Sequence, residues 1–253
     1  MLIMLALVLL LQSGPSGTQS APAVKEFAEW RSQQPPQTTL GELYTRYREH
    51  LKQKGLSDAQ IKEVFLEIER DRWNRMYSNP TPSFNTAPNA FLSDIVKTLK
   101  PGRALEIGMG QGRNSVYLAT LGWNVTGFDI SETGMAVARK SAEAAGVKIT
   151  TINSSMEAFD YGVEQWDLIV ATYEGAEWRE RALQGLKPGG IVVVEGFLRT
   201  PQTPQGASFG PNELVKMFLD LNLRIVRYED VEGKPDWGAQ PGRVVRLCAQ
   251  KPQ

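Results

Sequence analysis

From residue 89 onward, short apolar segments typical of strands alternate with longer stretches typical of helices. This alternation predicts strands paired in parallel through right-handed crossovers, because a parallel neighbour can be reached only by a long connection. The segments at 167–172 and 190–196 lack a strict alternation of apolar and polar residues, as expected of strands covered on both faces. The sequence therefore predicts an α/β fold, with helices on both faces of a mostly parallel sheet.

The C-terminal part departs from this alternation. Two strand-like segments, residues 223–231 and 243–250, are joined by 11 residues rich in Gly and Pro. Because this connection is too short to hold a crossover helix, the two segments are expected to pair in antiparallel fashion.

Between the first 23 residues and the main domain, apolar residues follow the helical period instead. Ser57 and Gln60 have the spacing of a capping box at the start of a helix. We expect a helical extension over residues 24–87 and a main domain over residues 88–253, with a Pro- and Asn-rich loop at the boundary. The extension either packs on the edge of the main domain or caps a substrate site. One face of its central helix gathers Leu40, Leu43, Tyr44, Tyr47 and Leu51.

The first 11 residues are apolar without interruption and lead into a small, polar linker. This run is short for a membrane span. Its exit at Ala21-Pro22-Ala23 resembles that of a secretory signal peptide, although no basic residue precedes Lys25. We interpret residues 1–23 as a signal-like leader and linker, with an uncleaved anchor or a misassigned start as the alternatives.

The scarcity of Cys and His limits the chemistry of the chain. A single cysteine, Cys248, excludes an intrachain disulfide framework, and with His50 as the one histidine a zinc site or a His-based triad is not expected. Cys248 lies in an apolar segment and is interpreted as a small core residue. Basic and acidic residues number 28 each, without a long basic run, so we expect no nucleic-acid partner.

The first predicted strand of the main domain ends in three glycines at every second position, Gly108, Gly110 and Gly112. Glycines allow a ligand to approach the backbone closely, and the following helix offers unpaired N–H groups. A dinucleotide-binding loop requires the pattern G-x-G-x-x-G, but Arg113 stands at the position of its last glycine.

Glu106 lies inside the apolar strand that precedes these glycines. A carboxylate is costly to bury unless donors surround it, so Glu106 is expected to meet loop N–H groups or a cationic group of a ligand. Arg113 either pairs with Glu106 or another nearby acid, or orients the carboxylate of a cofactor. A structural pair is the favoured interpretation.

The segment "ALEIGMGQGRNSVYLATLGWNVTGFDIS" resembles the first two motifs of class I S-adenosylmethionine-dependent methyltransferases. The segments "WDLIVAT" and "LKPGGIVVVEGF" are similar to the fourth and fifth strands of that family, and "GQGRNSVYLA" resembles its small-molecule and tellurite-resistance-type members. The resemblance extends over residues 88–250. It implies a Rossmann-like, seven-stranded sheet whose last strand is inserted antiparallel, and it implies S-adenosylmethionine as the cofactor.

The resemblance also implies roles for single residues. The three loop glycines would admit the methionine and ribose parts of the cofactor, and Glu106 would support the loop or face the cofactor ammonium. Asp129, at the end of the second strand, would hold both ribose hydroxyls, for which a carboxylate is suited because it accepts two hydrogen bonds. The alternative for Asp129 is a local role beside Ser131, and Ile130 would pack on the adenine.

The third motif departs from the family pattern. Many members have an acidic residue that receives the adenine amino group, whereas this chain has "SSMEAFD". Ser155 and Met156 are the expected adenine contacts, through the serine hydroxyl and the methionine N–H. Glu157 is a possible substitute.

Methyl transfer relies largely on alignment, and a general base is needed only if the acceptor carries a proton that has to leave. The candidates for that base follow the fourth strand, Tyr173 and Glu174 first and Glu177 after them, with Glu195 as a further possibility. Lining the cavity is the alternative role for each of them. An aromatic wall is expected from Trp73, Tyr77, Phe84 and Trp178.

We therefore expect a methyltransferase that acts on a small-molecule acceptor and needs no metal. The alternatives are an NAD(P)-dependent oxidoreductase of the Rossmann type, which Arg113 and the turn at 187–190 oppose, and a non-catalytic S-adenosylmethionine-binding protein. The leader indicates export or membrane tethering, whereas the cytosolic supply of the cofactor indicates the cytoplasm. Neither the acceptor nor the oligomeric state follows from the sequence.

Overall fold

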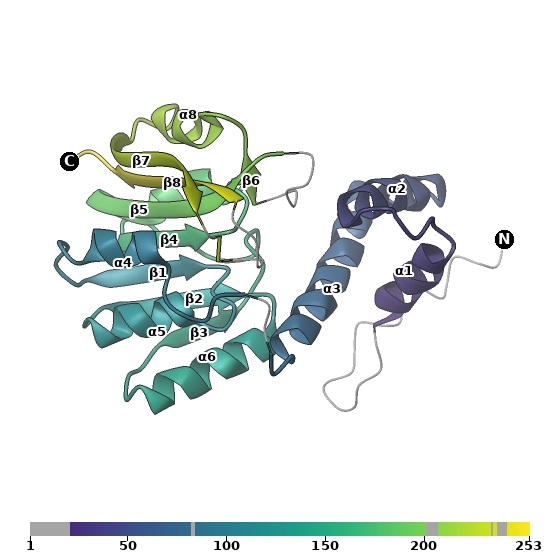
Figure 1. Ribbon diagram of the computed structural model, residues 1–253, viewed down its shortest axis with the longest axis horizontal. Helices are drawn as coiled ribbons and strands as arrows, with labels where there is room; N and C mark the ends of the chain where they lie inside the picture. Colours follow the sequence, from purple (N-terminus) through teal and green to yellow (C-terminus); the bar gives the residue numbers. More distant parts are fainter. Residues whose placement is uncertain (1–20, 82–83, 201–206, 234, 237–241) are drawn as a thin grey trace.

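The computed structural model describes residues 21–81, 84–200, 207–233, 235–236 and 242–253. The main domain is an eight-stranded, mostly parallel sheet with helices on both faces, and a helical extension lies to one side of it (Figure 1). The predicted α/β class is therefore confirmed. The strands follow the order β3-β2-β1-β4-β5-β8-β7, with β6 beside β5 and off this path.

The parallel part of the sheet is centred on β1 (Arg103–Ile107). This strand pairs with β2 (Asn124–Asp129) on one side and β4 (Trp166–Thr172) on the other, and the outer neighbours are β3 (Thr150–Asn153) and β5 (Leu186–Leu198). All of these pairs are parallel, so the carboxyl ends of the strands meet at one edge of the sheet, where ligands of such folds bind.

The helices cover two faces, because both faces of the central strands are apolar. Helices α4 (Ala90–Val96) and α5 (Arg113–Thr120) pack on one face, and α6 (Glu132–Ala144) lies beside α5. Helices α7 (Arg179–Gly185) and α8 (Glu213–Leu219) pack on the other face.

The C-terminal strands confirm the expected antiparallel pair. Strand β8 (Gly242–Gln250) runs antiparallel to β7 (Arg224–Gly233) and is inserted between β7 and β5. Cys248 is buried within β8, as expected of a small core residue. The prediction of seven strands is incomplete, since β6 (Ser208–Phe209) adds a short parallel pairing at the end of β5. A strand of two residues has no periodicity from which a sequence could reveal it.

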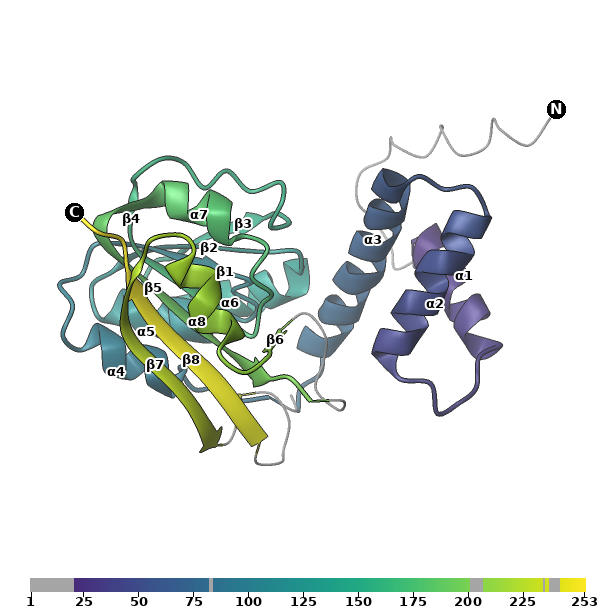
Figure 2. The same ribbon diagram turned by 90° about the horizontal axis from the view of Figure 1, so that it is seen from above.

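The extension consists of α1 (Pro22–Ser32), α2 (Leu40–Gln53) and α3 (Asp58–Tyr77), which share a small apolar core of their own. The predicted capping box is present: the Ser57 hydroxyl accepts from the Gln60 N–H, and the Gln60 side chain accepts from the Ser57 N–H. Figures 1 and 2 show α1 and α2 standing away from the sheet, while α3 runs from them to the main domain.

The leader proposed for residues 1–23 lies outside the described residues except for its last three, of which Ala21 precedes α1 and the other two begin it. Within the described ranges, no helix is long and apolar enough to cross a membrane. The division between extension and main domain remains a prediction, and the C-terminal end of α3 reaches the carboxyl edge of the sheet (Figure 1).

Candidate active site

The loop between β1 and α5 has a backbone that favours glycine. Gly108, Gly110 and Gly112 all have positive φ values, at 62°, 50° and 74°. Other residues rarely adopt this conformation. The absent side chains also matter, because a Cβ on Gly108 would overlap the Glu174 carboxylate and a Cβ on Gly110 would overlap the Tyr77 hydroxyl.

Asp129 ends β2 and fixes the loop from one side. Its carboxylate accepts the N–H of Gly110 at 2.8 Å and the N–H of Ser131 at 2.7 Å, one on each oxygen. Burial raises the pKa of Asp129, and the backbone N–H groups partly oppose that rise. Because a carboxylate offers about four acceptor positions, both oxygens retain capacity toward the cavity that Asp129 lines.

Glu106 supports the helix that follows the loop. Its buried carboxylate accepts from the Asn114 amide at 2.9 Å and from the Ser115 hydroxyl, both in the first turn of α5. Burial raises the pKa of Glu106 to about 7, although these hydrogen bonds act in the opposite direction. The donors are thus side chains of α5 and not loop N–H groups.

Arg113 pairs with Asp236, in the connection between β7 and β8, and not with Glu106. The guanidinium donates to Asp236 at 2.7 Å and to the Ala87 carbonyl at 2.9 Å. Asp236 also accepts from the Asn89 amide at 2.7 Å. Burial opposes ionisation of Asp236, but the charge and hydrogen bond of Arg113 outweigh it and lower the pKa. The favoured interpretation of a structural pair is confirmed, with a partner that the sequence did not identify.

Tyr173 is engaged in the same buried network. Its hydroxyl donates to Glu195 at 2.6 Å and accepts the Asp236 N–H at 2.9 Å. Glu195 in turn accepts from Asn89 at 2.8 Å and from Arg246 at 2.6 Å. The Tyr173 hydroxyl and the Glu195 carboxylate are thus both engaged within the protein, where they join the ends of β4 and β5 to the β7–β8 connection. A catalytic role for either residue remains a prediction.

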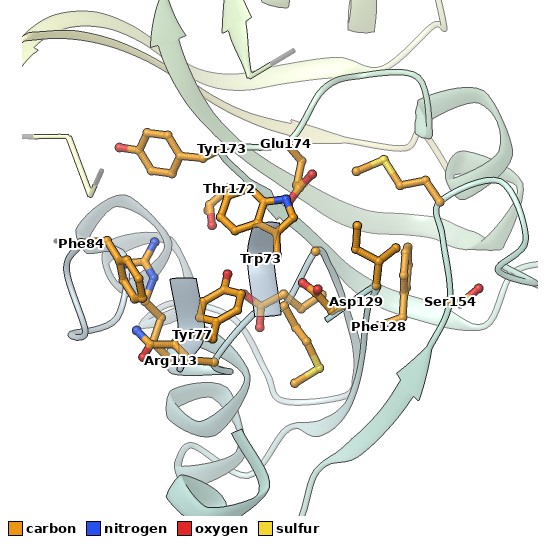
Figure 3. Close-up of a pocket in the computed structure, with 16 residues that line it drawn as sticks. Trp73, Tyr77, Phe84, Arg113, Phe128, Asp129, Ser154, Thr172, Tyr173 and Glu174 are labelled. Carbon is orange, nitrogen blue, oxygen red and sulfur yellow. The ribbon is translucent and has the colours of Figure 1, made fainter. Parts of the chain in front are cut away.

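Glu174 has a different environment. It is partly buried, and its carboxylate makes no hydrogen bond to any of the described residues. It lies against Gly108, whereas the side chain of Tyr173 points away from it (Figure 3). Burial, and then the negative charges of Asp129, Glu177 and Glu69, raise the pKa of Glu174 well above its ordinary value. Of the two predicted catalytic residues, Glu174 is the one whose polar group has no hydrogen-bond partner among the described residues.

The cavity between these groups has a volume of about 110 Å³. Ile130 and Met156 line it as expected, but Ser154 lines it in place of Ser155, whose hydroxyl accepts the Ala158 N–H at 3.2 Å. The predicted contacts with a cofactor remain predictions. The described lining consists of Trp73, Tyr77, Phe84, Glu106, Gly108, Met109, Gln111, Arg113, Phe128, Asp129, Ile130, Ser154, Met156, Thr172, Tyr173 and Glu174.

The aromatic wall differs from the expected one in one member. Trp73 and Tyr77 come from the end of α3 and Phe84 from the loop after it, and all three line the cavity. Trp178 is buried in the core against Phe218 and does not line it. The end of the extension thus lines the cavity, and its role as a cap over a substrate site remains a prediction.

Residues 104–190 match a family model described as a methyltransferase domain. A probable S-adenosyl-L-methionine-dependent methyltransferase TehB of Haemophilus influenzae is 36% identical over 147 residues, which are 53% of this chain and 51% of that protein. A ubiquinone biosynthesis O-methyltransferase of Chelativorans sp. is 32% identical over 162 residues, which are 56% of this chain and 64% of that protein. The chain thus spans only about half to two thirds of the length of these relatives.

Solved structures agree on the fold. The crystal structure of TehB from Haemophilus influenzae matches with a TM-score of 0.57 at 23% identity, over 72% of this chain and 66% of that one. The [4+2]-cyclase SpnF matches with a TM-score of 0.54 at 17% identity, over 71% of this chain and 90% of that one. The resemblance seen in the sequence is confirmed. Because a protein named as a cyclase shares this fold, the activity of the present chain has to be argued from its site and not from its fold.

Proposed function

We propose that this chain, which carries a class I methyltransferase domain of the TehB type, binds S-adenosylmethionine and transfers its methyl group to a small molecule. The observation that carries the proposal is the pairing of Asp129 with the bare glycine loop. Asp129 is buried at the end of β2, accepts one loop N–H, and retains acceptor capacity toward a cavity that Gly108 of the same loop also lines.

The described residues fit this cofactor in three respects. Gly108 lines the cavity without a side chain, Asp129 can accept from two vicinal hydroxyls, and Ile130 and Met156 offer apolar surface suited to a purine. We assign the ribose to Asp129 and the adenine to Ile130 and Met156, with the hydroxyl of Ser154 or Ser155 beside it. Glu106 holds the first turn of α5, which follows the glycine loop.

When bound, S-adenosylmethionine supplies an activated methyl carbon. The protein then has to align the acceptor, exclude water and receive any proton that leaves. Glu174 is suited to the last task, because its carboxylate has no partner among the described residues and its raised pKa makes it a stronger base than an exposed carboxylate. Tyr173 acts as a positioning residue, since its bond to Glu195 fixes the backbone that carries Glu174. The aromatic side chains of α3 cover the cavity.

Calorimetric titration with S-adenosylhomocysteine tests the proposal. We expect micromolar binding by the unchanged chain and a loss of about tenfold or more for Asp129→Ala, since a hydrogen bond to a charged group contributes about 1.5–3 kcal/mol. Glu143→Gln, on the exposed face of α6, is the matched control and should leave the affinity unchanged. Absence of binding up to millimolar concentrations, or an Asp129→Ala variant with full affinity, would refute it.

The two alternatives have separate tests. A change in the fluorescence of reduced nicotinamide on titration with the protein would favour the dinucleotide interpretation. We expect no change, because Arg113 stands at the position of the last glycine of that pattern and pairs with Asp236. Binding of S-adenosylhomocysteine without turnover of any acceptor in a broad panel would favour a non-catalytic binding protein.

We also propose that residues 1–23 act as a signal-like leader and that residues 24–87 and 88–253 form the extension and the catalytic domain. N-terminal sequencing of the natively expressed protein tests the first statement. A start at residue 1 in mature protein would leave an anchor as the remaining interpretation.

A further inference from the structure

Carboxylates outnumber available cations around the cavity. The charged residues of its described lining are Glu106, Asp129, Glu174 and Arg113. Arg113 is neutralised by Asp236 at 2.7 Å, and both of these side chains are about nine-tenths buried. Its guanidinium is therefore not available to an anionic ligand.

The guanidinium of Arg72, which neighbours the lining residue Trp73, is engaged as well. Arg72 donates to Glu69 at 2.7 Å and lies over the ring of Trp73, 4.3 Å from its centroid. Glu69 adds to the negative potential at Glu174 even so, together with Asp129 and Glu177. A negatively charged ligand would enter this environment without a partner and at a large cost of desolvation.

Glu174 is the one carboxylate of the lining that has no donor among the described residues, whereas Glu106 and Asp129 are each held by two. Crowded carboxylates of this kind disfavour ionisation until a cation approaches. A cationic ligand would be attracted to Glu174 and would restore its charge, so that protons are released as the ligand binds.

The aromatic side chains favour the same class of ligand. Trp73 and Tyr77 stack with their centroids 5.9 Å apart, and Figure 3 shows both directed toward the space that Asp129 and Glu174 also face. Aromatic faces attract ammonium groups, most strongly where water is excluded. The Arg72 guanidinium already covers a face of Trp73, so Tyr77 supplies the aromatic surface that remains opposite the Glu174 carboxylate. An aromatic ring opposite a carboxylate without a described donor is the environment of an amine site.

We propose that the methyl acceptor is a cationic amine attached to an apolar or aromatic body, and that Glu174 both recognises its ammonium group and accepts its proton. This inference rests on the proposed methyltransferase function. The ammonium loses one proton to the Glu174 carboxylate, which leaves a neutral amine with a free lone pair and a neutral carboxylic acid. The proton then passes to solvent, so that the carboxylate is restored.

The test uses the full chain saturated with S-adenosylhomocysteine and a set of probes matched in shape. Calorimetry at pH 7 compares 2-phenylethylamine, 2-phenylethanol and 3-phenylpropionate. We expect the amine to bind at least about tenfold more tightly than the carboxylate, with the alcohol between them. Equal or tighter binding of the carboxylate, or no binding of the amine to the saturated protein, would overturn the inference.

Substitutions show which residue is responsible for the preference for the amine. Glu174→Gln should abolish the preference for the amine, and Glu174→Asp, which keeps the charge, should restore part of it. Glu180→Gln is the control, because that side chain is exposed in the same segment. If Glu174→Gln kept the preference, Glu174 would not be the recognition group.

Proton release gives a readout that does not depend on turnover. Titrations in two buffers with different ionisation enthalpies should show net release of protons when the amine binds, and less release in Glu174→Gln. Failure of S-adenosylhomocysteine to bind at all would count against the proposed function. Binding of S-adenosylhomocysteine with no charge preference among the probes would count against the present inference alone.

Discussion

Arg113 at the start of α5 and Asp236 in the β7–β8 connection form an ion pair of 2.7 Å, and both side chains are about nine-tenths buried. The pair joins segments that lie 123 residues apart in the chain. Through Asn89, Glu195 and Tyr173 it extends into a network that links the first turn of α5 to the ends of β4 and β5. The glycine loop and the segment carrying Glu174 are therefore held by one set of polar contacts.

Removal of one partner of this pair should destabilise the protein strongly. We expect Asp236→Ala to lower the free energy of unfolding by about 3–5 kcal/mol, because Arg113 would remain as a buried, uncompensated charge. Urea unfolding followed by tryptophan fluorescence measures this. Asp94→Ala, which breaks the exposed pair with Arg227, should change the midpoint little. An equal effect of both substitutions on the unfolding free energy would contradict the assignment of Arg113 and Asp236 as a buried structural pair.

Glu106 should make stability depend on pH. Burial raises its pKa from 4.5 to about 7, so between these values the folded protein binds more protons than the unfolded chain. Stability is therefore lost as the pH rises through this window, by about 3 kcal/mol. The difference in unfolding free energy between the unchanged protein and Glu106→Gln should shift by this amount between pH 4.5 and pH 8. A difference that does not vary with pH would refute the prediction.

Gly134 should tolerate alanine poorly, although it lies within helix α6. Alanine in a helix is normally favoured over glycine by about 1 kcal/mol. Here a Cβ would lie 2.9 Å from the Tyr77 ring and 3.1 Å from the backbone of Gly110. We expect Gly134→Ala to be destabilising in urea unfolding, and part of its cost to disappear in the Tyr77→Ala background. A stabilising Gly134→Ala would show that α3 does not lie against this helix.

Asn74 should control how firmly the end of α3 is attached. Its side-chain oxygen accepts from the Ser131 hydroxyl at 2.7 Å and from the Thr133 N–H at 3.2 Å. We expect Asn74→Ala to speed amide hydrogen exchange in the C-terminal half of α3 while the part that packs on α1 and α2 stays protected. Exposed Asn124, at the start of β2, provides the control site. Unchanged exchange in α3 would contradict this role.

Local patterns were sufficient to predict most of the fold. The alternation of strands and helices, the capping box at Ser57 and the short connection before β8 each depend on neighbouring residues, and each is confirmed. The partner of Arg113 could not be found in this way. Asp236 lies in a Gly- and Pro-rich connection, and nothing in its neighbours indicates that the chain folds back onto α5.

The candidate site shows the same limit at the scale of single residues. Tyr173 and Glu174 are consecutive and both line the cavity, but Tyr173 has a positive φ of 62° and its hydroxyl is bonded to Glu195. The sequence identified the segment but not which of the two has a polar group without a described partner. The same shift of one position separates Ser154, which lines the cavity, from Ser155, which caps a turn. Asn89 caps α4 and also contacts Glu195, and a contact between residues so far apart in the chain leaves no local pattern in the sequence.

The cavity of about 110 Å³ is smaller than the roughly 300–1,000 Å³ of typical small-molecule sites. Since the Tyr77 hydroxyl lies over Gly110, we expect the end of α3 to move outward before a ligand of nucleoside size enters, and again before the spent ligand departs. The residence time of the ligand would then be governed by a helix that precedes the sheet domain in the sequence. A chain that begins at residue 88 would exchange its ligand quickly and hold it weakly.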